Sequence, residues 1–92
     1  MDDSISVLDV ASLGEALRQA RKEQGLTQQD FADIVGVGVR FLSELERGKP
    51  TAEIGLVFQV LRGSGFELVL RRRDHRGPTV TKRGPEPEDN EP

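Results

Sequence analysis

Four stretches of the chain place apolar residues at the spacing of an α-helix. The first runs from 12 to 24, where Ser12 and Glu15 have the S-x-x-E spacing of a capping box. The second begins after Thr27, a predicted N-cap with Asp30 three residues further on. The apolar residues of these two helices that we expect to be buried are Leu13, Ala16, Leu17, Ala20, Phe31, Ala32 and Val35.

Glycines separate the second helix from the third. Gly36 ends the second helix, because the positive φ of a helix stop is cheap only for glycine, and the apolar Val37 fills the corner. Gly38 opens the third helix, in which Leu42 and Leu45 face inward. The pattern therefore predicts two short helices joined by a glycine-centred turn.

A fourth helix is predicted to begin at the N-cap Thr51 and to end at about Arg62. Its apolar residues at helical spacing are Ile54, Val57, Phe58 and Leu61. Phe58 is large for so small a core, so it either packs inside the domain or contacts a second subunit.

Residues 66–73 alternate between apolar and polar side chains, which predicts a β-strand. A lone strand leaves its backbone groups unsatisfied. The same strand of a second copy is the simplest partner, since a two-fold axis makes that pairing self-complementary. The segment around Ile5 to Leu8 is the competing partner. The residues expected at a subunit interface are Phe58, Phe66, Leu68, Val69 and Leu70.

The stretch TQQDFADIVGVGVRFLSELERG, residues 27–48, resembles the helix-turn-helix of the Cro/C1-type (Xre) family. Counted from Gln28, the small Ala32 is fifth and Gly36 is ninth, in the turn. Leu42 and Leu45 are fifteenth and eighteenth, in the core. The longer stretch RFLSELERGKPTAEIGLVFQVLRGSGFEL is similar to HipB-type antitoxins. The alternative is a plain helical hairpin with a glycine turn.

This resemblance implies an all-α, lambda-repressor-like DNA-binding domain of four to five helices over residues 12–65. Residues 66–73 then form the one C-terminal β-strand, which pairs across a homodimer. Residues 1–11 are expected to be an N-terminal arm, either a short strand or disordered. Residues 74–92 are rich in proline and charge and nearly free of apolar groups, which predicts a disordered acidic tail.

The resemblance also implies which side chains contact DNA. Arg40 is the candidate for a bidentate contact to guanine, and Val39 or Phe41 for a thymine methyl. Glu44 either accepts a hydrogen bond from cytosine or repels phosphates. The positions implied for base contact are Gly38, Val39, Arg40, Phe41, Ser43 and Glu44, and those implied for phosphates are Gln28, Arg47 and Lys49.

Two further expectations follow from these positions. Gly38 departs from the Ser, Thr or Lys common in the family, so the third helix lacks one side-chain cap. Arg21 and Glu46 match a pair that links the first and third helices, and we interpret that pair as architecture.

Composition narrows the possible functions. The chain of 92 residues has a formal net charge of −3 and no cysteine, which excludes disulfides and thiolate metal sites. The net negative charge comes from the two ends, −2 from residues 1–3 and −1 from residues 75–92, and residues 4–74 hold ten basic and ten acidic side chains. A neutral body predicts modest non-specific DNA affinity. The only histidine, His75, lies in the predicted tail, and no catalytic constellation or cofactor motif is present, so an enzyme is not expected.

No apolar run approaches the ~20 residues needed to cross a bilayer, and the acidic start is unlike a signal peptide. A cytoplasmic, nucleoid-associated bacterial protein is therefore expected. The resemblance implies a homodimeric repressor of double-stranded operator DNA, acting as the antitoxin of a HipA-like kinase toxin in a HipBA-like operon. The alternatives are a free-standing Cro/C1-type regulator and a module that binds only proteins.

Overall fold

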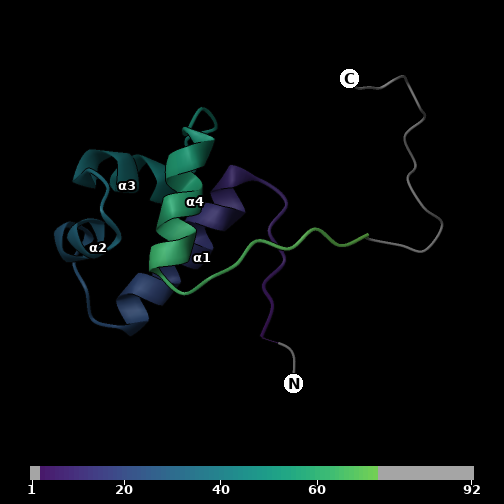
Figure 1. The fold of residues 1–92 in the computed structure, drawn as a ribbon, viewed down its shortest axis with the longest axis horizontal. Coiled ribbons are helices and arrows are strands. Elements are labelled where there is room, and N and C mark those ends of the chain that lie inside the picture. Colours follow the sequence, from purple (N-terminus) through teal and green to yellow (C-terminus); the bar gives the residue numbers. More distant parts are fainter. Residues whose placement is uncertain (1–2, 73–92) are drawn as a thin grey trace.

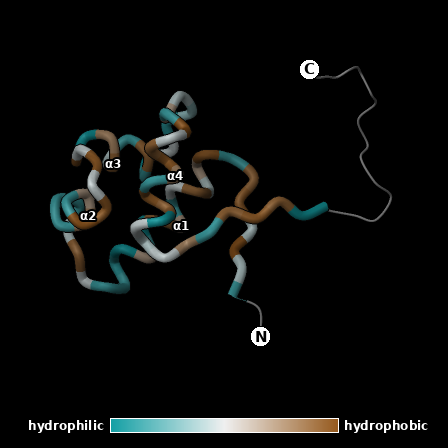
Figure 2. The backbone as a smooth tube through the Cα atoms, in the orientation of Figure 1, coloured by the Kyte–Doolittle hydropathy of each residue, from teal (hydrophilic) through white to brown (hydrophobic). Residues whose placement is uncertain are grey.

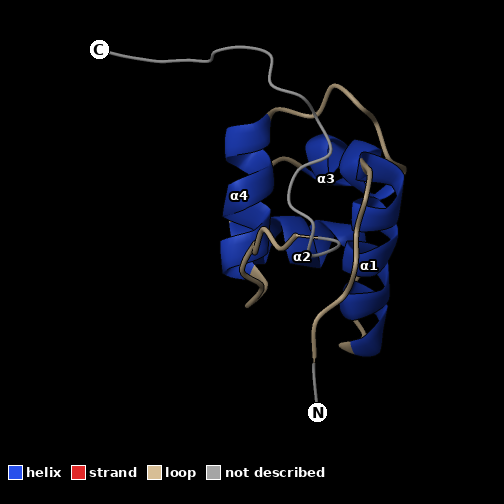
Figure 3. Cartoon of the chain, turned by 90° about the vertical axis from the view of Figure 1, so that its right-hand side faces the viewer, coloured by secondary structure: helices blue, strands red, loops and turns tan. Residues whose placement is uncertain are grey.

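The computed structural model describes residues 3–72 and shows four helices in that range (Figure 1). They are α1 (Val10–Glu23), α2 (Gln28–Val35), α3 (Val39–Glu46) and α4 (Ile54–Gly63). Figure 3 shows α1 and α4 as two upright helices with α2 and α3 between them. The architecture is the all-α helix-turn-helix arrangement that the sequence predicts.

One hydrophobic core holds the four helices together, and each of them contributes to it. The core positions predicted on the second and third helices are confirmed, and Val37 packs against this core from the turn. The buried apolar residues are Leu17, Phe31, Ala32, Val35, Leu42, Leu45, Val57, Val60 and Leu61. Because no pair of helices has a core of its own, the domain is expected to unfold as a unit.

The first helix begins earlier than the sequence predicted. Asp9, not Ser12, is the N-cap, and Ser12 is the third helical residue. Asp9 Oδ1 accepts from the Ser12 backbone N–H at 2.8 Å, and Ser12 Oγ accepts from the Asp9 N–H at 3.3 Å. The capping box is therefore D-x-x-S. Glu15 instead accepts a hydrogen bond from Gln19 at 2.9 Å on the helix surface.

The start and the buried face of α4 also differ from the prediction. Glu53, not Thr51, is the N-cap, and its carboxylate accepts from the backbone N–H groups of Gly55 and Leu56. Val60, which was not among the residues predicted to face the core, is buried. Ile54 and Phe58, both predicted on the apolar face, are exposed, and Phe58 therefore does not fill the core. Val57 and Leu61, the other two residues predicted on the apolar face of this helix, are buried as predicted.

Residues 66–72 leave the helical body without joining a sheet. Phe66 packs against the core as its backbone N–H donates to the Leu61 carbonyl at 2.9 Å, which ends α4 in a Schellman turn. The described range contains no strand, so the pairing with the segment around Ile5 to Leu8 does not form in the single chain. Figure 2 shows the hydrophobic run after α4 lying outside the helices. Pairing across a homodimer stays a prediction, and the predicted tail, 74–92, lies outside the described residues.

Candidate DNA-binding site

The turn between α2 and α3 has the capping geometry that its sequence predicts. Thr27 Oγ1 accepts from the Asp30 backbone N–H at 3.0 Å, and Asp30 Oδ2 accepts from the Thr27 backbone N–H at 3.5 Å. Gly36 ends α2 with φ 83°, in the left-handed region that favours glycine. Gly38 is the N-cap of α3 and makes no side-chain cap, as expected for glycine. The backbone N–H groups of the first turn of α3 therefore have no side-chain partner at the cap.

A buried ion pair fixes α3 against α1. Arg21 Nε and Nη2 donate to the two carboxylate oxygens of Glu46 at 2.8 and 3.0 Å. The side chains are 9% and 2% exposed, so this pair is shielded from solvent. Hydrogen bonding to Glu46 raises the pKa of Arg21 above its ordinary value, against the effect of burial. The architectural role expected for this pair is consistent with its geometry.

Gln28 joins the same network from the start of α2. Its side-chain Nε2 donates to Glu46 Oε1 at 3.0 Å, and Arg21 Nη1 also donates to the Leu26 carbonyl at 2.7 Å. One of the two amide hydrogens of Gln28 is thus directed to Glu46. The sequence spacing carried no sign of this bond.

A second contact that the sequence did not reveal holds the turn from the side of α4. Gln59 Nε2 donates to the carbonyl of Val35 at 3.1 Å and to that of Gly36 at 2.8 Å. These carbonyls end α2, where the helix has no intrahelical donors left to offer. Gln59 therefore fixes the turn that sets the direction of α3.

The outward side of α3 carries most of the residues implied for base contact. Val39 is 38% exposed, and the Arg40 side chain is 90% exposed at the beginning of the helix. One turn further on, Ser43 Oγ accepts from Arg47 Nη1 at 3.0 Å. The eight residues of α3 form a rod of about 12 Å at 1.5 Å per residue. This helix is short enough to enter a major groove by its N-terminal end.

Glu44 on α3 lies between two cations, Arg40 on the same helix and Lys49 in the link that follows. Its Oε2 is 3.4 Å from Arg40 Nε, and its Oε1 is 3.1 Å from Lys49 Nζ. The hydrogen bond from Lys49, aided by Arg40, holds the pKa of the Glu44 carboxyl below its ordinary value. The structure therefore brings together three of the residues that the sequence assigned to separate contacts.

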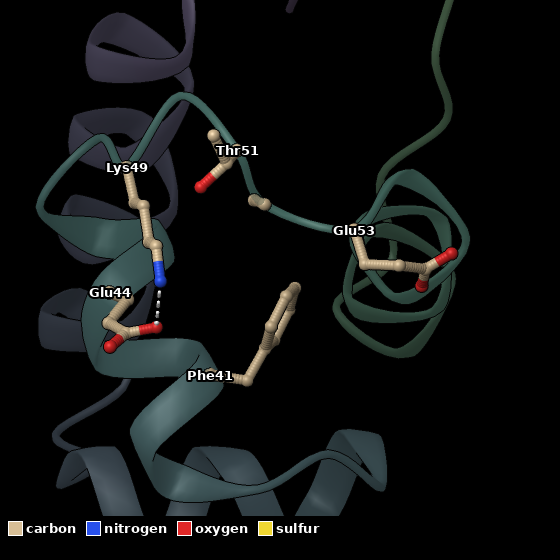
Figure 4. A pocket seen from close by; sticks show the side chains of 6 residues that line it. Phe41, Glu44, Lys49, Thr51 and Glu53 are labelled. Atoms are coloured by element: carbon tan, nitrogen blue, oxygen red, sulfur yellow. Dashed lines mark hydrogen bonds and ion pairs between the residues drawn. The ribbon is translucent and has the colours of Figure 1, made fainter.

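Phe41 is turned away from the exposed row. It is half-buried against the core and lines a shallow hollow of about 200 Å³ with residues of α3 and of the link to α4. In Figure 4 its ring points into the space between α3 and the Glu53 backbone, and Lys49 extends toward Glu44 on the other side. Of the two residues expected to contact a thymine methyl, Val39 is the better placed.

Residues 3–72 also lack the features of two other classes of protein. No group of three or more His, Cys, Asp or Glu side chains is arranged there to hold a metal ion. None of the four helices is long and apolar enough to cross a membrane.

Comparison with solved structures agrees with this geometry. A HipB–O4 20mer complex has a TM-score of 0.70 at 18% identity, over 77% of this chain and all of that one. A HipA–HipB–O2–O3 complex gives the same values. The clp gene regulator ClgR from Corynebacterium glutamicum has a TM-score of 0.57 at 32% identity, over 72% of this chain and 85% of ClgR. The HipB likeness shows a shared fold.

Sequence comparison identifies the family. The helix-turn-helix family model matches residues 17–63. An HTH-type transcriptional regulator of Sinorhizobium fredii, y4mF, is 53% identical over 58 residues, which are 63% of this chain and 76% of the relative. A second HTH-type regulator, from Methanothermobacter thermautotrophicus, is 36% identical over 58% of this chain and 77% of that protein. The chain thus belongs to the Cro/C1-type helix-turn-helix family of transcriptional regulators.

Proposed function

We propose that this protein binds a two-fold operator as a homodimer and represses the operon that encodes it. The observation that carries the proposal is the exposed row of α3 held in a fixed direction by the buried Arg21–Glu46 pair and by Gln59. Within this row Arg40 is the base-reading residue, with its side chain 90% exposed. Because a bidentate arginine distinguishes guanine, the row supports sequence-specific binding.

The contacts to the DNA backbone come from both ends of the motif. Gln28 stands at the N-terminus of α2, where helix N–H groups favour a phosphate. Arg47 follows α3 and is the candidate for a flanking phosphate, whereas Lys49, the other residue implied for phosphates, is paired with Glu44 at 3.1 Å in the free protein. Since residues 4–74 are formally neutral, these few groups give a modest non-specific affinity, and the base contacts must supply the rest.

We further propose that the repressor is an antitoxin that binds a HipA-like kinase toxin. Two observations support this role: the resemblance of residues 40–68 to HipB-type antitoxins and the shared fold with HipB in a HipA–HipB complex. A free-standing regulator is the second candidate, which the likeness to the clp gene regulator ClgR favours. A kinase-like reading frame beside this gene, whose product co-purifies with this protein, is expected for the antitoxin only.

Selection from a random duplex library by the wild-type protein tests the DNA-binding function. The enriched sequence is expected to contain two related half-sites about one helical turn apart, ~34 Å, or a multiple of it. Footprinting then shows whether both half-sites are protected. A single unrepeated half-site bound by a monomer contradicts the proposal, and no DNA affinity even at low salt indicates a module that binds only proteins.

Substitutions of Arg40 and Gln28 separate base contacts from backbone contacts. Arg40→Ala is expected to cost ~1–3 kcal/mol at one base pair and to relax specificity there. Gln28→Ala is expected to weaken all sequences alike, because a phosphate contact carries no base information. Fluorescence anisotropy with the selected site and its single-base variants measures both effects. Equal losses of specific and non-specific binding in the two variants would show that α3 is not the reading helix.

A further inference from the structure

Two charged side chains of α3, Arg40 and Glu44, and Lys49 from the link after α3 form a row of ion pairs that the fold does not require. Each oxygen of the Glu44 carboxylate faces one cation, Arg40 at 3.4 Å and Lys49 at 3.1 Å. Arg40 is 90% exposed, Lys49 is 48% exposed and Glu44 is 24% exposed. Ion pairs with one partner so exposed add little to stability. Their contribution to the fold is therefore small.

The order of these charges along α3 is unfavourable for the helix. Arg40 lies in the first turn, where the positive end of the helix dipole disfavours a cation. Glu44 lies near the C-terminal end, where the dipole disfavours an anion. Arginine before glutamate at i, i+4 is also the weaker orientation of such a pair. Helix stability does not explain why these residues stand in this order.

We propose that Glu44 is a positioning residue for DNA recognition, which orders Arg40 for its base contact and restrains Lys49 from phosphates. The inference rests on the proposed function, in which Arg40 reads a base. A long arginine loses rotamer entropy when it binds, and a partner that already restricts it reduces that loss. Lys49 is held twice, because its backbone N–H also donates to the Glu44 carbonyl at 3.1 Å.

The geometry favours positioning over a direct contact between Glu44 and cytosine. Both carboxylate oxygens already face donors, and Arg40 is the more exposed member of the pair. In Figure 4 the Glu44 carboxylate is met by Lys49, which extends over it from the link after α3. A glutamate carboxyl is ionised at neutral pH even at its ordinary pKa, and the neighbouring cations lower the pKa of Glu44 further, so the restraint operates at neutral pH.

Removing the charge of Glu44 therefore has opposite effects on specific and non-specific binding. Glu44→Gln keeps the size of the side chain but releases Lys49, which becomes free to reach a phosphate. Non-specific affinity rises, and the slope of log K against log salt becomes steeper by about 0.9 for one added phosphate contact. Discrimination at the base pair read by Arg40 falls, because the guanidinium is no longer ordered.

The test uses the full chain and the duplex that the wild-type protein selects. Wild type, E44Q, R40A and the R40A/E44Q double variant are titrated against this duplex and its single-base variants at several salt concentrations. E44Q is expected to lose about fivefold or more of the discrimination at the Arg40 base pair, and the double variant to discriminate no worse than R40A. Thermal melts establish that each variant is folded.

Glu15→Gln is the matched control. Glu15 is an exposed carboxylate on α1 that pairs with Arg18 at 3.9 Å, so its loss changes the net charge equally without touching α3. E15Q is expected to leave both discrimination and salt slope unchanged. An E15Q protein that reproduces the effects of E44Q would show that net charge alone is responsible and would overturn the proposal.

Three other results overturn the inference in distinguishable ways. If E44Q relaxes a base pair different from that of R40A, and the effects add in the double variant, Glu44 contacts a base directly. If the wild-type protein enriches no sequence, the proposed function fails and the positioning role fails with it. Selection by wild type combined with unchanged discrimination in E44Q contradicts the positioning role alone.

Discussion

Two glycines of this domain differ in what surrounds their missing side chains. A Cβ at Gly14 would meet the backbone carbonyl oxygen of Leu45 and lie 2.8 Å from that of Glu46, so α1 and α3 approach closely there. A Cβ at Gly38 would meet nothing within 4 Å. The first glycine is therefore a packing requirement, whereas the second leaves α3 without a side-chain cap.

Gly14→Ala and Gly38→Ser should therefore change stability in opposite directions. Alanine at 14 gains about 1 kcal/mol of helix propensity, but displacing backbone of α3 costs ~3 kcal/mol, so a net loss near 2 kcal/mol is expected. Serine at 38 supplies a cap and should add a few tenths of a kcal/mol. Thermal melts measure both, at about 4–8 °C per kcal/mol. A Gly14→Ala protein as stable as wild type would show that the helices can separate freely.

At this scale the sequence predicted which residues lie on the reading helix but not what they touch. Helical spacing placed Leu42 and Leu45 inside and Arg40 outside, and the structure confirms all three. The sequence could not decide whether Glu44 accepts a hydrogen bond from cytosine or repels phosphates. The reason is that the position of Lys49 depends on how the chain turns after α3. The contact of Gln59 with the turn joins residues 23 and 24 positions apart, and no local pattern reports such a pair.

At the scale of the helices, the sequence predicted all four helices and the N-caps of α2 and α3, but not the N-caps of α1 and α4. Ser12 stands three residues after Asp9 and three before Glu15, so both spacings can form a capping box. The helix takes the earlier one, which adds Val10 to the residues packed on the core. For α4 the shift from Thr51 to Glu53 shows the same ambiguity between neighbouring caps.

The cap of α1 makes stability depend on acid. The hydrogen bond from the Ser12 backbone holds the pKa of Asp9 below its ordinary value of 3.8. A depressed carboxyl pKa stabilises the folded state above the unfolded pKa, and that contribution is lost as pH falls through the folded pKa. Asp9→Asn retains an acceptor without a charge, so its melting temperature should fall less than that of wild type below pH ~4.

Glu15→Gln is the control for this acid dependence, since it removes an exposed carboxylate that caps no helix. Its melting temperature is expected to follow that of wild type through the same pH range. If Asp9→Asn also followed wild type, the capping carboxylate would not be the group that loses stability in acid.

At the scale of the molecule, three consecutive apolar side chains directly after the helical body are exposed. Leu68, Val69 and Leu70 are 48%, 65% and 92% exposed, and Phe58 on α4 is 38% exposed. A body of about 60 residues buries only about 60% of its unfolded surface, so association would add a stabilising apolar contact. A sequence pattern specifies the alternation of these residues, but it carries no information on the segment with which a predicted strand pairs.

The last prediction tests whether residues 66–72 pair with the same segment of a second copy. Along a strand, successive N–H groups point to opposite edges, so either Val69 or Leu70 must donate to the partner. Proline removes that donor, and the two-fold axis doubles the loss. One of Val69→Pro and Leu70→Pro should therefore raise the dimer dissociation constant at least about fivefold, since each hydrogen bond is worth ~0.5–1.5 kcal/mol. Val69→Ala and Leu70→Ala keep the donor and serve as controls. Sedimentation equilibrium measures all four, and two fully dimeric proline variants would place the interface elsewhere.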